Sequence, residues 1–235
     1  MPRTTKKSRR PRLSCARITQ HAIRIIDRSG TESLSMRSLS SSLGVEAMSL
    51  YAHFASKDEL LGAVAAALLD EVELPAIRSS PRSRLESLAR GMRLLGHKHP
   101  NAFALVILNP QRLASALRLT EFALHAFTDA GLSGRAAVQA QRVLLGFVRG
   151  YTLWEIGGFA IGCRPGPGRP VRARVARDLR ALGQPRFPNI HRFADELTHF
   201  SPDAEFESGV RLILDATLPA RKNKSGRTSR PHTPR

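Results

Sequence analysis

Residues 34–54 read LSMRSLSSSLGVEAMSLYAHF, and the spacing of their apolar side chains is the strongest structural signal in the chain. The spacing predicts a helix over about residues 36–43 and a second helix over about residues 46–53. Gly44 separates them as a turn, and Ser35 precedes the first helix as a cap. Two short helices joined in this way form a helix-turn-helix.

The faces of this helix pair differ in chemistry. The side chains expected to be buried together are Leu39, Leu43, Val45, Leu50 and Phe54. The side chains left outward on the second helix are Ala47, Met48, Ser49, Tyr51 and His53. A DNA major groove about 12 Å wide admits one such helix, so the outward residues are candidate DNA contacts. Helix pairs with a glycine turn also occur in proteins that bind no DNA, so this pattern alone leaves the function open.

Helices are also predicted on both sides of this pair. The preceding one covers about residues 14–29, with Ser14 as its cap and Gly30 at its end. The following one starts at Lys57, after the capping-box sequence that begins at Ser56. We therefore expect one helical domain over residues 14–74.

The remaining body of the chain also has helical periodicity. The predicted helices cover about residues 83–97, 101–108, 110–130, 134–161, 171–182, 193–200 and 203–218. The Pro- and Gly-rich residues 163–170 predict a loop. No strand is predicted. We expect an all-α fold, with an N-terminal three-helix domain carrying the helix-turn-helix and a second helical domain over residues 82–218.

Positive charge is concentrated at the two ends of the chain. The 235 residues have a formal net charge of +18, and residues 1–12 and 219–235 hold six Lys or Arg each with no acid. Residues 13–73 instead carry five basic and eight acidic side chains, a net of −3. We predict a disordered basic arm over residues 1–13 and a disordered basic tail over residues 219–235. Such ends favour a nucleic-acid partner, although they also occur as solvated tails.

Other features of the composition exclude several classes of protein. No run of about 20 apolar residues predicts a transmembrane helix, and no secretory leader is evident, so we expect a cytoplasmic protein without membrane contact. Cys15 and Cys163 form neither a disulfide framework nor a zinc pattern. Cys15 alone is conceivable as a redox sensor, but an inert thiol is the simpler interpretation.

From Ile18 to Val64 the sequence closely resembles the N-terminal domain of the TetR family of transcriptional regulators. The residues that carry the resemblance are Ala22, Gly30, LSMRSL at 34–39, LGV at 43–45, LYAHF at 50–54 and KDELL at 57–61. The resemblance implies that Ala47, Met48, Ser49, Tyr51 and His53 face DNA. It adds the DNA contacts Ser35, Met36 and Arg37 at the start of the preceding helix, and it implies that Lys57 binds a phosphate.

Residues 187–197 and 203–216 resemble the end of the regulatory domain in the tetracycline-repressor-like branch of that family. The resemblance implies an unknown small-molecule effector and a homodimer formed by the helices at about 134–161 and 203–218. Gly146, Gly150, Gly158 and Gly162 favour close helix approach in the first of these. Residues 104–110 lack the histidine with which tetracycline repressor holds its magnesium–tetracycline complex, so tetracycline is not the expected effector.

An apolar effector pocket is expected between the helices of the second domain. Its candidate lining residues are Met92, Phe103, Asn109, Phe122, Phe147, Tyr151, Trp154 and Glu155, although each apolar one is equally a candidate for ordinary core. The spacing of His97 and His99 does not favour a metal site. Neither a metal nor a cofactor is predicted.

Together these features predict a ligand-responsive repressor that binds a palindromic operator as a dimer. A basic protein that coats DNA without sequence preference, and an activator of the same family, stay open as alternatives. An enzyme is not expected, because the sequence has no Gly-x-Ser-x-Gly, P-loop or His-Glu-x-x-His motif.

Overall fold

The computed structural model describes residues 12–108, 114–157, 169–183, 186–199 and 201–219. All regular elements in these residues are helices, as the sequence predicts. They are α1 (Cys15–Ser29), the 3₁₀ helix η1 (Thr31–Ser33), α2 (Met36–Leu43), α3 (Ala47–Tyr51), α4 (Lys57–Asp70), α5 (Pro81–Lys98), α6 (Phe103–Leu108), α7 (Ala114–Asp129), α8 (Gly134–Ile156), α9 (Arg169–Gly183), α10 (Pro188–Arg192), α11 (Ala194–Thr198) and α12 (Pro202–Thr217).

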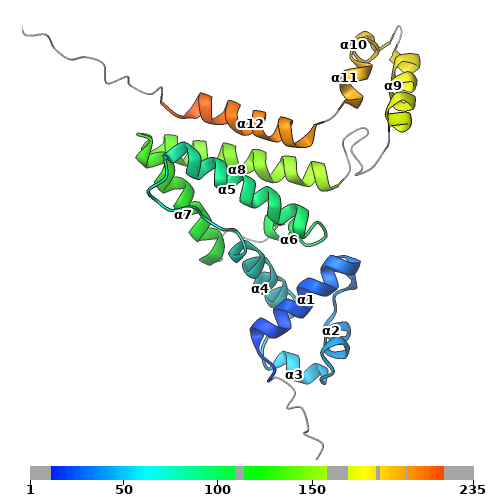
Figure 1. The fold of residues 1–235 in the computed structure, drawn as a ribbon. Coiled ribbons are helices and arrows are strands. Elements are labelled where there is room, and N and C mark those ends of the chain that lie inside the picture. The colour runs from blue at the N-terminus through cyan, green and yellow to red at the C-terminus, as the bar shows by residue number, and fades with distance from the viewer. Residues whose placement is uncertain (1–11, 109–113, 158–168, 184–185, 200, 220–235) are drawn as a thin grey trace, which may run out of the picture.

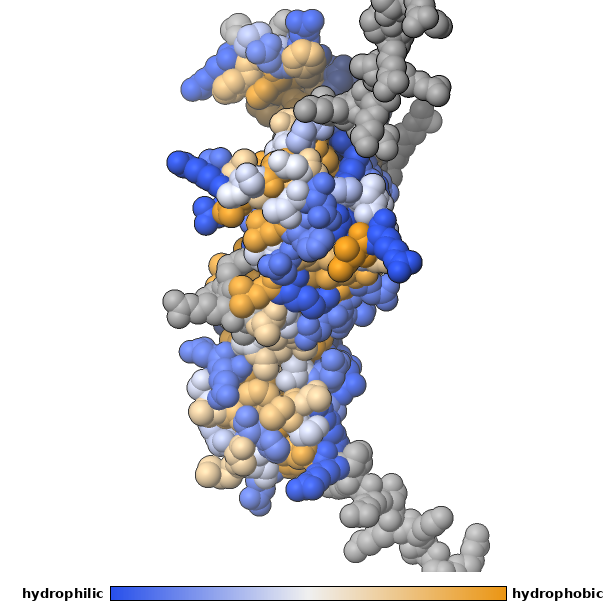
Figure 2. Space-filling model, turned by 90° about the vertical axis from the view of Figure 1, so that its left-hand side faces the viewer, coloured by the Kyte–Doolittle hydropathy of each residue, from blue (hydrophilic) through white to orange (hydrophobic). Residues whose placement is uncertain are grey.

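The helices form three groups (Figure 1). α1–α4 make the part at the bottom of the view, α5–α8 and α12 make the central body, and α9–α11 pack on one another at the top right. α4 packs against α1 and also against α6 and α7, so it joins the N-terminal part to the body. Figure 2 shows hydrophobic side chains on the surface of both parts, interspersed with hydrophilic ones.

The boundaries of the first helices follow from their caps. Ser14 and Ser35 accept backbone hydrogen bonds from Arg17 and Ser38, at 3.3 Å and 3.0 Å. α2 ends at Gly44, whose left-handed backbone (φ 66°, ψ 38°) suits glycine. These caps are local, so the sequence locates α1 and α2 correctly.

Several other boundaries differ from the prediction. α3 ends at Tyr51, two residues before the predicted end, and α4 ends at Asp70, five residues before Pro75. α5 starts at Pro81, because Ser80 caps it and proline is tolerated at the first helical position. α9 starts at Arg169, so the last two residues of the predicted loop at 163–170 are helical and the others lie outside the described residues. Ser201 makes no side-chain capping bond to α12.

The central body is built around α8. α5 crosses α8 at Gly96, where a side chain would clash with the methyl group of Thr152. α12 lies along α8 and contributes Phe206, which is fully buried, and Gly209, where a side chain would clash with the Phe147 ring. Glycine at both crossings therefore allows the helices to pack closely.

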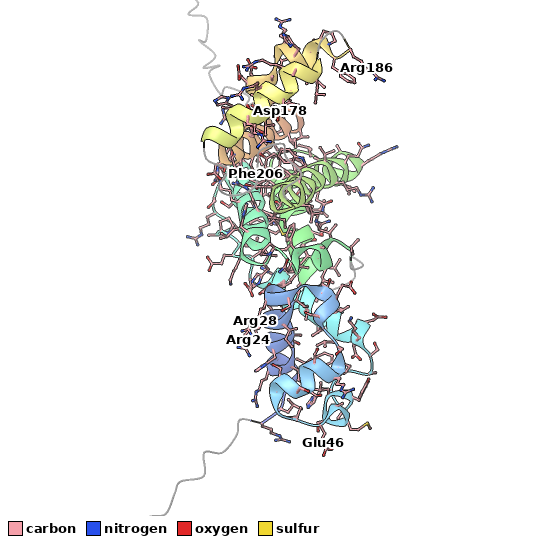
Figure 3. All side chains as sticks on the ribbon, turned by 90° about the vertical axis from the view of Figure 1, so that its right-hand side faces the viewer. Arg24, Arg28, Glu46, Asp178, Arg186 and Phe206 are labelled. Carbon is pink, nitrogen blue, oxygen red and sulfur yellow. The ribbon has the colours of Figure 1, made fainter. Side chains whose placement is uncertain are left out.

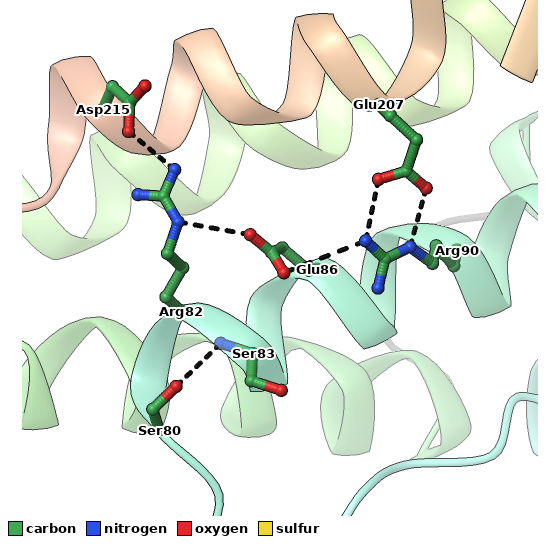
Figure 4. Close-up of polar contacts among 7 residues, drawn as sticks. All are labelled: Ser80, Arg82, Ser83, Glu86, Arg90, Glu207 and Asp215. Carbon is green, nitrogen blue, oxygen red and sulfur yellow. Dashed lines mark hydrogen bonds and ion pairs between the residues drawn. The ribbon is translucent and has the colours of Figure 1, made fainter. Parts of the chain in front are cut away.

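A row of ion pairs holds α12 on α5 (Figure 4). Arg82 donates to Asp215 at 2.6 Å, and Arg90 binds Glu207 through two bonds of 2.6 and 2.7 Å. Glu86 lies between the two arginines and accepts from Arg82 at 3.2 Å.

Among the described residues, no helix is long and apolar enough to cross a membrane.

Candidate DNA-binding surface and effector groove

The helix-turn-helix presents a mixed surface to solvent. On α3, Leu50 is fully buried, whereas Met48 is 74% exposed and Tyr51 is 46% exposed. Ser49 is exposed, and Ala47 and His53 are half-buried. The five outward residues expected from the sequence therefore lie together, and Leu50 anchors the helix that carries them.

The predicted DNA contacts outside α3 differ in their exposure. Ser35 and Arg37 are exposed at the start of α2, and Lys57 is half-buried in the first turn of α4. Met36 corrects the expectation, because its side chain is only 8% exposed and belongs to the hydrophobic core. An eight-residue helix has room for one inward face, and Met36 occupies it together with Leu39 and Leu43. Its side chain is thus a packing residue rather than a DNA contact.

The structure also brings forward residues that the sequence analysis did not select. Glu46 is exposed at the start of α3, at the end of the molecule farthest from the body, and its side chain makes no capping bond (Figure 3). Arg24 and Arg28 project from α1 (Figure 3). The i,i+4 spacing of Arg24 and Arg28 was the available signal for an exposed basic face.

Cys15 connects α1 to the recognition helix. Its Sγ lies 3.7 Å from Nδ1 of His53, just beyond the end of α3, and the thiol is exposed. The contact joins the first residue of α1 to His53, a candidate DNA contact that lies two residues beyond the end of α3.

A groove of about 820 Å³ runs between α5, the segment after α4 and the start of α12. Charged side chains dominate its lining, which consists of Glu71, Glu73, Arg90, Gly91, Arg93, Leu94, Leu95, His97, Lys98, Glu155, Asp203 and Glu207. Most residues of this lining are charged, unlike the mainly apolar set of pocket residues expected from the sequence. The opposite charges are paired across different helices, which sequence periodicity cannot reveal.

Glu155 is the most buried acid of this groove, with 8% exposure. Arg93 binds it through two hydrogen bonds of 2.6 and 2.8 Å, and His97 Nε2 lies 3.0 Å from it. Burial alone would raise the pKa of Glu155, but the bonds from Arg93 and His97 outweigh it and hold the pKa below its ordinary value. The same pairing raises the pKa of Arg93. Glu155 is therefore a buried, paired carboxylate at the wall of the groove.

The other predicted pocket residues are distributed over several places. Met92 and Phe103 are core residues with 1% and 0% exposure, and Phe122 is half-buried against that core. Phe147, Tyr151 and Trp154 line a separate hollow of about 400 Å³ with Gly146, Gly150 and Glu205. Asn109 lies outside the described residues. Only Glu155 of the predicted set lines the large groove.

The described residues contain no group of three or more His, Cys, Asp or Glu side chains arranged to hold a metal ion. His97 and His99 face different carboxylates: His97 contacts Glu155, and His99 contacts Asp27 and Glu71. Each histidine is thus used in an ion-pair cluster.

Two comparisons with known families cover almost all of the described chain. Residues 18–64 match the bacterial regulatory proteins of the tetR family, and residues 75–217 match the tetracyclin repressor-like C-terminal domain. The chain belongs to the TetR family. The resemblance carried by the helix-turn-helix residues is confirmed, together with that of the C-terminal half.

Individual relatives agree with this family. The chain is 35% identical over 212 residues, 87% of each protein, to an HTH-type transcriptional regulator of Saccharopolyspora erythraea. It is 28% identical over 222 residues to the HTH-type transcriptional repressor DrrR1 of Streptomyces coeruleorubidus, covering 91% of this chain and 80% of that protein. The crystal structure of the Streptomyces coelicolor TetR family protein ActR in complex with actinorhodin superposes with a TM-score of 0.76 at 26% identity, covering 88% of this chain and 97% of ActR.

Membership of the TetR family makes this protein a helix-turn-helix transcriptional regulator and not an enzyme. The exposed face of α3 is the candidate DNA-contacting surface of this regulator.

Proposed function

We propose that this TetR-family protein is a repressor that binds a palindromic operator as a homodimer and is released by a small-molecule effector. The observation that carries the proposal is the face of α3, where a buried Leu50 holds Met48, Ser49 and Tyr51 outward. DrrR1, a relative, is named a repressor, and ActR has been crystallised with actinorhodin, which supports the repressor and effector parts of the proposal.

The contacts divide between reading and positioning. Ala47 and Met48 offer apolar surface that suits the thymine methyl group, and Arg37 suits a guanine edge or a phosphate. Phosphate contacts fall to Ser35, Ser49, Tyr51, His53 and Lys57, of which Lys57 lies at a helix N-terminus where backbone amides add to the attraction. None of the residues on α3 forms a bidentate base contact, so we infer that DNA shape contributes to recognition.

The homodimer interface is proposed on the outer faces of α8 and α12. Val143, Trp154 and Leu212 are large apolar side chains with 54%, 36% and 67% exposure. Gly146 and Gly150 lie on the same face of α8, and a side chain at either would meet open space within this chain. Exposed glycines lower helix stability by about 0.8–1 kcal/mol each relative to alanine, so their place beside exposed apolar groups favours close contact with a second chain. Gly158 and Gly162 lie outside the described residues.

The effector is proposed to bind in the charged groove. Its walls come from α5, α8 and α12, so a ligand there contacts both the proposed dimer helices and the helix that follows the DNA-binding part. Ligand binding shifts the protein only if the two states bind it with different free energies. We infer that the effector favours a dimer whose recognition helices no longer match two half-sites about 34–36 Å apart.

Selection from a random DNA library tests the function. We expect one palindrome to be enriched, and the Tyr51→Ala variant to lose it while the control Leu182→Ala, at an exposed position of α9, keeps it. A salt titration of binding to the selected site separates sequence-specific recognition from non-specific electrostatic attraction to phosphates. Tight binding that enriches no sequence and fades uniformly with salt would replace the proposal by non-specific DNA coating. Transcription from a promoter carrying the site distinguishes repressor from activator.

Sedimentation tests the dimer. Arg at position 212 in place of Leu puts a charge in the proposed interface, so Leu212→Arg is expected to sediment as a monomer at concentrations where the wild type is a dimer. Leu117→Arg, at a 53% exposed position on α7, is the matched control. A dimeric Leu212→Arg protein would contradict the interface on α12.

A further inference from the structure

One cluster of charged side chains joins the DNA-binding part to the body. His99, which follows α5, is only 6% exposed. Its Nδ1 lies 2.7 Å from Oδ2 of Asp27 on α1, and its Nε2 lies 3.1 Å from Oε2 of Glu71, just after α4. Asn101 adds a bond from its side-chain amide to the backbone carbonyl of Asp27 at 2.9 Å. Both helices that frame the helix-turn-helix therefore contact one turn of the body.

The chemistry of the cluster fixes the form of His99. An ionised carboxylate accepts hydrogen bonds and has none to donate. Two ring nitrogens that both face carboxylates must both carry hydrogen, which is the imidazolium form. Burial opposes the charge of Glu71, but the bonds from Lys98 at 2.5 Å and from His99 hold the pKa of Glu71 below its ordinary value. His99 therefore bridges two carboxylates from different helices.

Asp27 depends on this histidine. Its second oxygen, Oδ1, is buried and has no hydrogen-bond partner in the described structure. Among the described side-chain contacts of Asp27, Oδ2 has one hydrogen-bond partner, His99. Charge-assisted hydrogen bonds are roughly twice as strong as neutral ones. Loss of the imidazolium would leave a partly buried carboxylate unpaired at the junction of α1 with the body.

We propose that His99 is a positioning residue that fixes the orientation of the helix-turn-helix relative to the regulatory body. The expected effect of His99 on operator binding rests on the proposed function, whereas its contacts with Asp27 and Glu71 do not. With the imidazolium in place, the DNA-binding part keeps one orientation and enters the operator already arranged. Without it, α1 and α4 lose their shared anchor, and the DNA-binding part samples several orientations.

Distance measurement within one chain tests the proposal directly. Spin labels are attached to the native, exposed Cys15 on α1 and to a cysteine introduced as Leu117→Cys on α7, in a Cys163→Ser background. Labelled chains are mixed with an excess of unlabelled chains, so that only the distance within one chain is measured by electron resonance. The full-length protein is compared with its His99→Gln form, because glutamine is neutral and carries both of its N–H donors on one nitrogen, so it does not reproduce the two separate donors of the imidazole ring.

We expect a broader distance distribution in His99→Gln than in the parent protein. Asp27→Asn, which keeps the shape and removes the charge, is expected to broaden it too, and the double variant to be no broader than His99→Gln, since both changes break one contact. The control is His125→Gln, because His125 contacts Asp129 within the body at 3.1 Å. Equal widths in the parent and His99→Gln, or equal broadening in the control, would overturn the proposal.

Operator affinity gives the functional consequence. On the selected palindrome, unlabelled His99→Gln is expected to bind roughly tenfold more weakly than the wild type, with His125→Gln unchanged. Unchanged or tighter binding by His99→Gln would overturn the assignment of the anchored state as the DNA-binding one. A wild-type chain that selects no sequence would refute the proposed function, while the distance widths would still decide the role of His99.

Discussion

Two arginines on one face of α5 make the same kind of bond at different depths, and this permits a sharp stability experiment. Arg93 binds Glu155 through two bonds of 2.6 and 2.8 Å, and Arg90 binds Glu207 through two bonds of 2.6 and 2.7 Å. The side chains of the first pair are 14% and 8% exposed, and those of the second are 52% and 36% exposed. The geometry of the two pairs is nearly the same and their burial differs most, while Arg93 additionally binds Asp203 at 2.8 Å and lies over the Phe206 ring.

Replacing each arginine by leucine separates the two cases. Arg93→Leu leaves Glu155 buried with only His97 beside it, and breaking a buried pair costs about 3 kcal/mol or more. For a chain of this length, that lowers Tm by roughly 6–12 °C. Arg90→Leu removes a solvated pair and costs about 1 kcal/mol or less. Thermal unfolding followed by circular dichroism, at equal protein concentration, measures both.

Acidification adds a second test. The pKa of Glu155 is lowered in the folded protein, so its contribution to stability is present above the ordinary carboxyl pKa and is lost as pH falls through the lower, folded value. In Arg93→Leu, only His97 opposes the effect of burial on the pKa of Glu155. Acidification therefore removes less stability from this variant than from the wild type. The difference in Tm between the wild type and Arg93→Leu should shrink between neutral pH and about pH 4. If Arg93→Leu were no less stable than Arg90→Leu, the reasoning would be refuted. A difference in Tm between the wild type and Arg93→Leu that grows as pH falls would also refute it.

Three further predictions concern other parts of the chain. Gly96→Ala is expected to lower Tm by a few degrees through its clash with the Thr152 methyl group, and Thr152→Ser should restore part of that loss in the double variant. An unchanged Tm loss in the double variant would contradict the close contact of α5 with α8 at Gly96. Ser35→Ala removes the cap of α2 and should lower the free energy of unfolding in urea by about 1 kcal/mol, so a wild-type value would argue against the cap. Deletion of residues 1–12, with six basic side chains, should reduce the salt slope of DNA binding by as much as about 5 per chain, whereas an unchanged slope would show that the arm does not touch phosphates.

The N-terminal part follows from sequence because its determinants are local. Ser35 caps α2 and Gly44 ends it within ten residues of each other, and the apolar spacing between them places Leu39 and Leu43 inside. Met36 precedes Leu39 by three residues and Leu43 by seven, so helical spacing alone places it on the same inward face, whereas its assignment as a DNA contact came from the family resemblance.

The regulatory part could not be predicted to the same depth because its determinants are distant in the chain. Arg93 and Glu155 are 62 positions apart, and His99 and Asp27 are 72 apart. Each member of such a pair looks like an ordinary surface charge in the sequence, since periodicity locates a helix face but not its partner. The expected pocket residues are divided for this reason: Met92 and Phe103 lie in the core, Glu155 lines the charged groove, and Phe147, Tyr151 and Trp154 line a separate hollow.

The positive charge and the candidate base contacts lie in different parts of this protein. Residues 13–73 carry a net charge of −3, so the helix-turn-helix itself supplies little of the attraction to phosphates, and the basic ends carry most of the positive charge. The proposed base contacts on α3 are few, so in the proposed homodimer we expect discrimination to come from two such faces held at the correct separation. A regulator built this way loses its operator when the orientation of its DNA-binding parts changes, even if each part keeps its contacts. Under the proposed function, the junction where His99 joins α1 and α4 to the body therefore has the largest effect on operator binding, and a ligand in the groove, which Glu71 partly lines, would act on DNA binding through it.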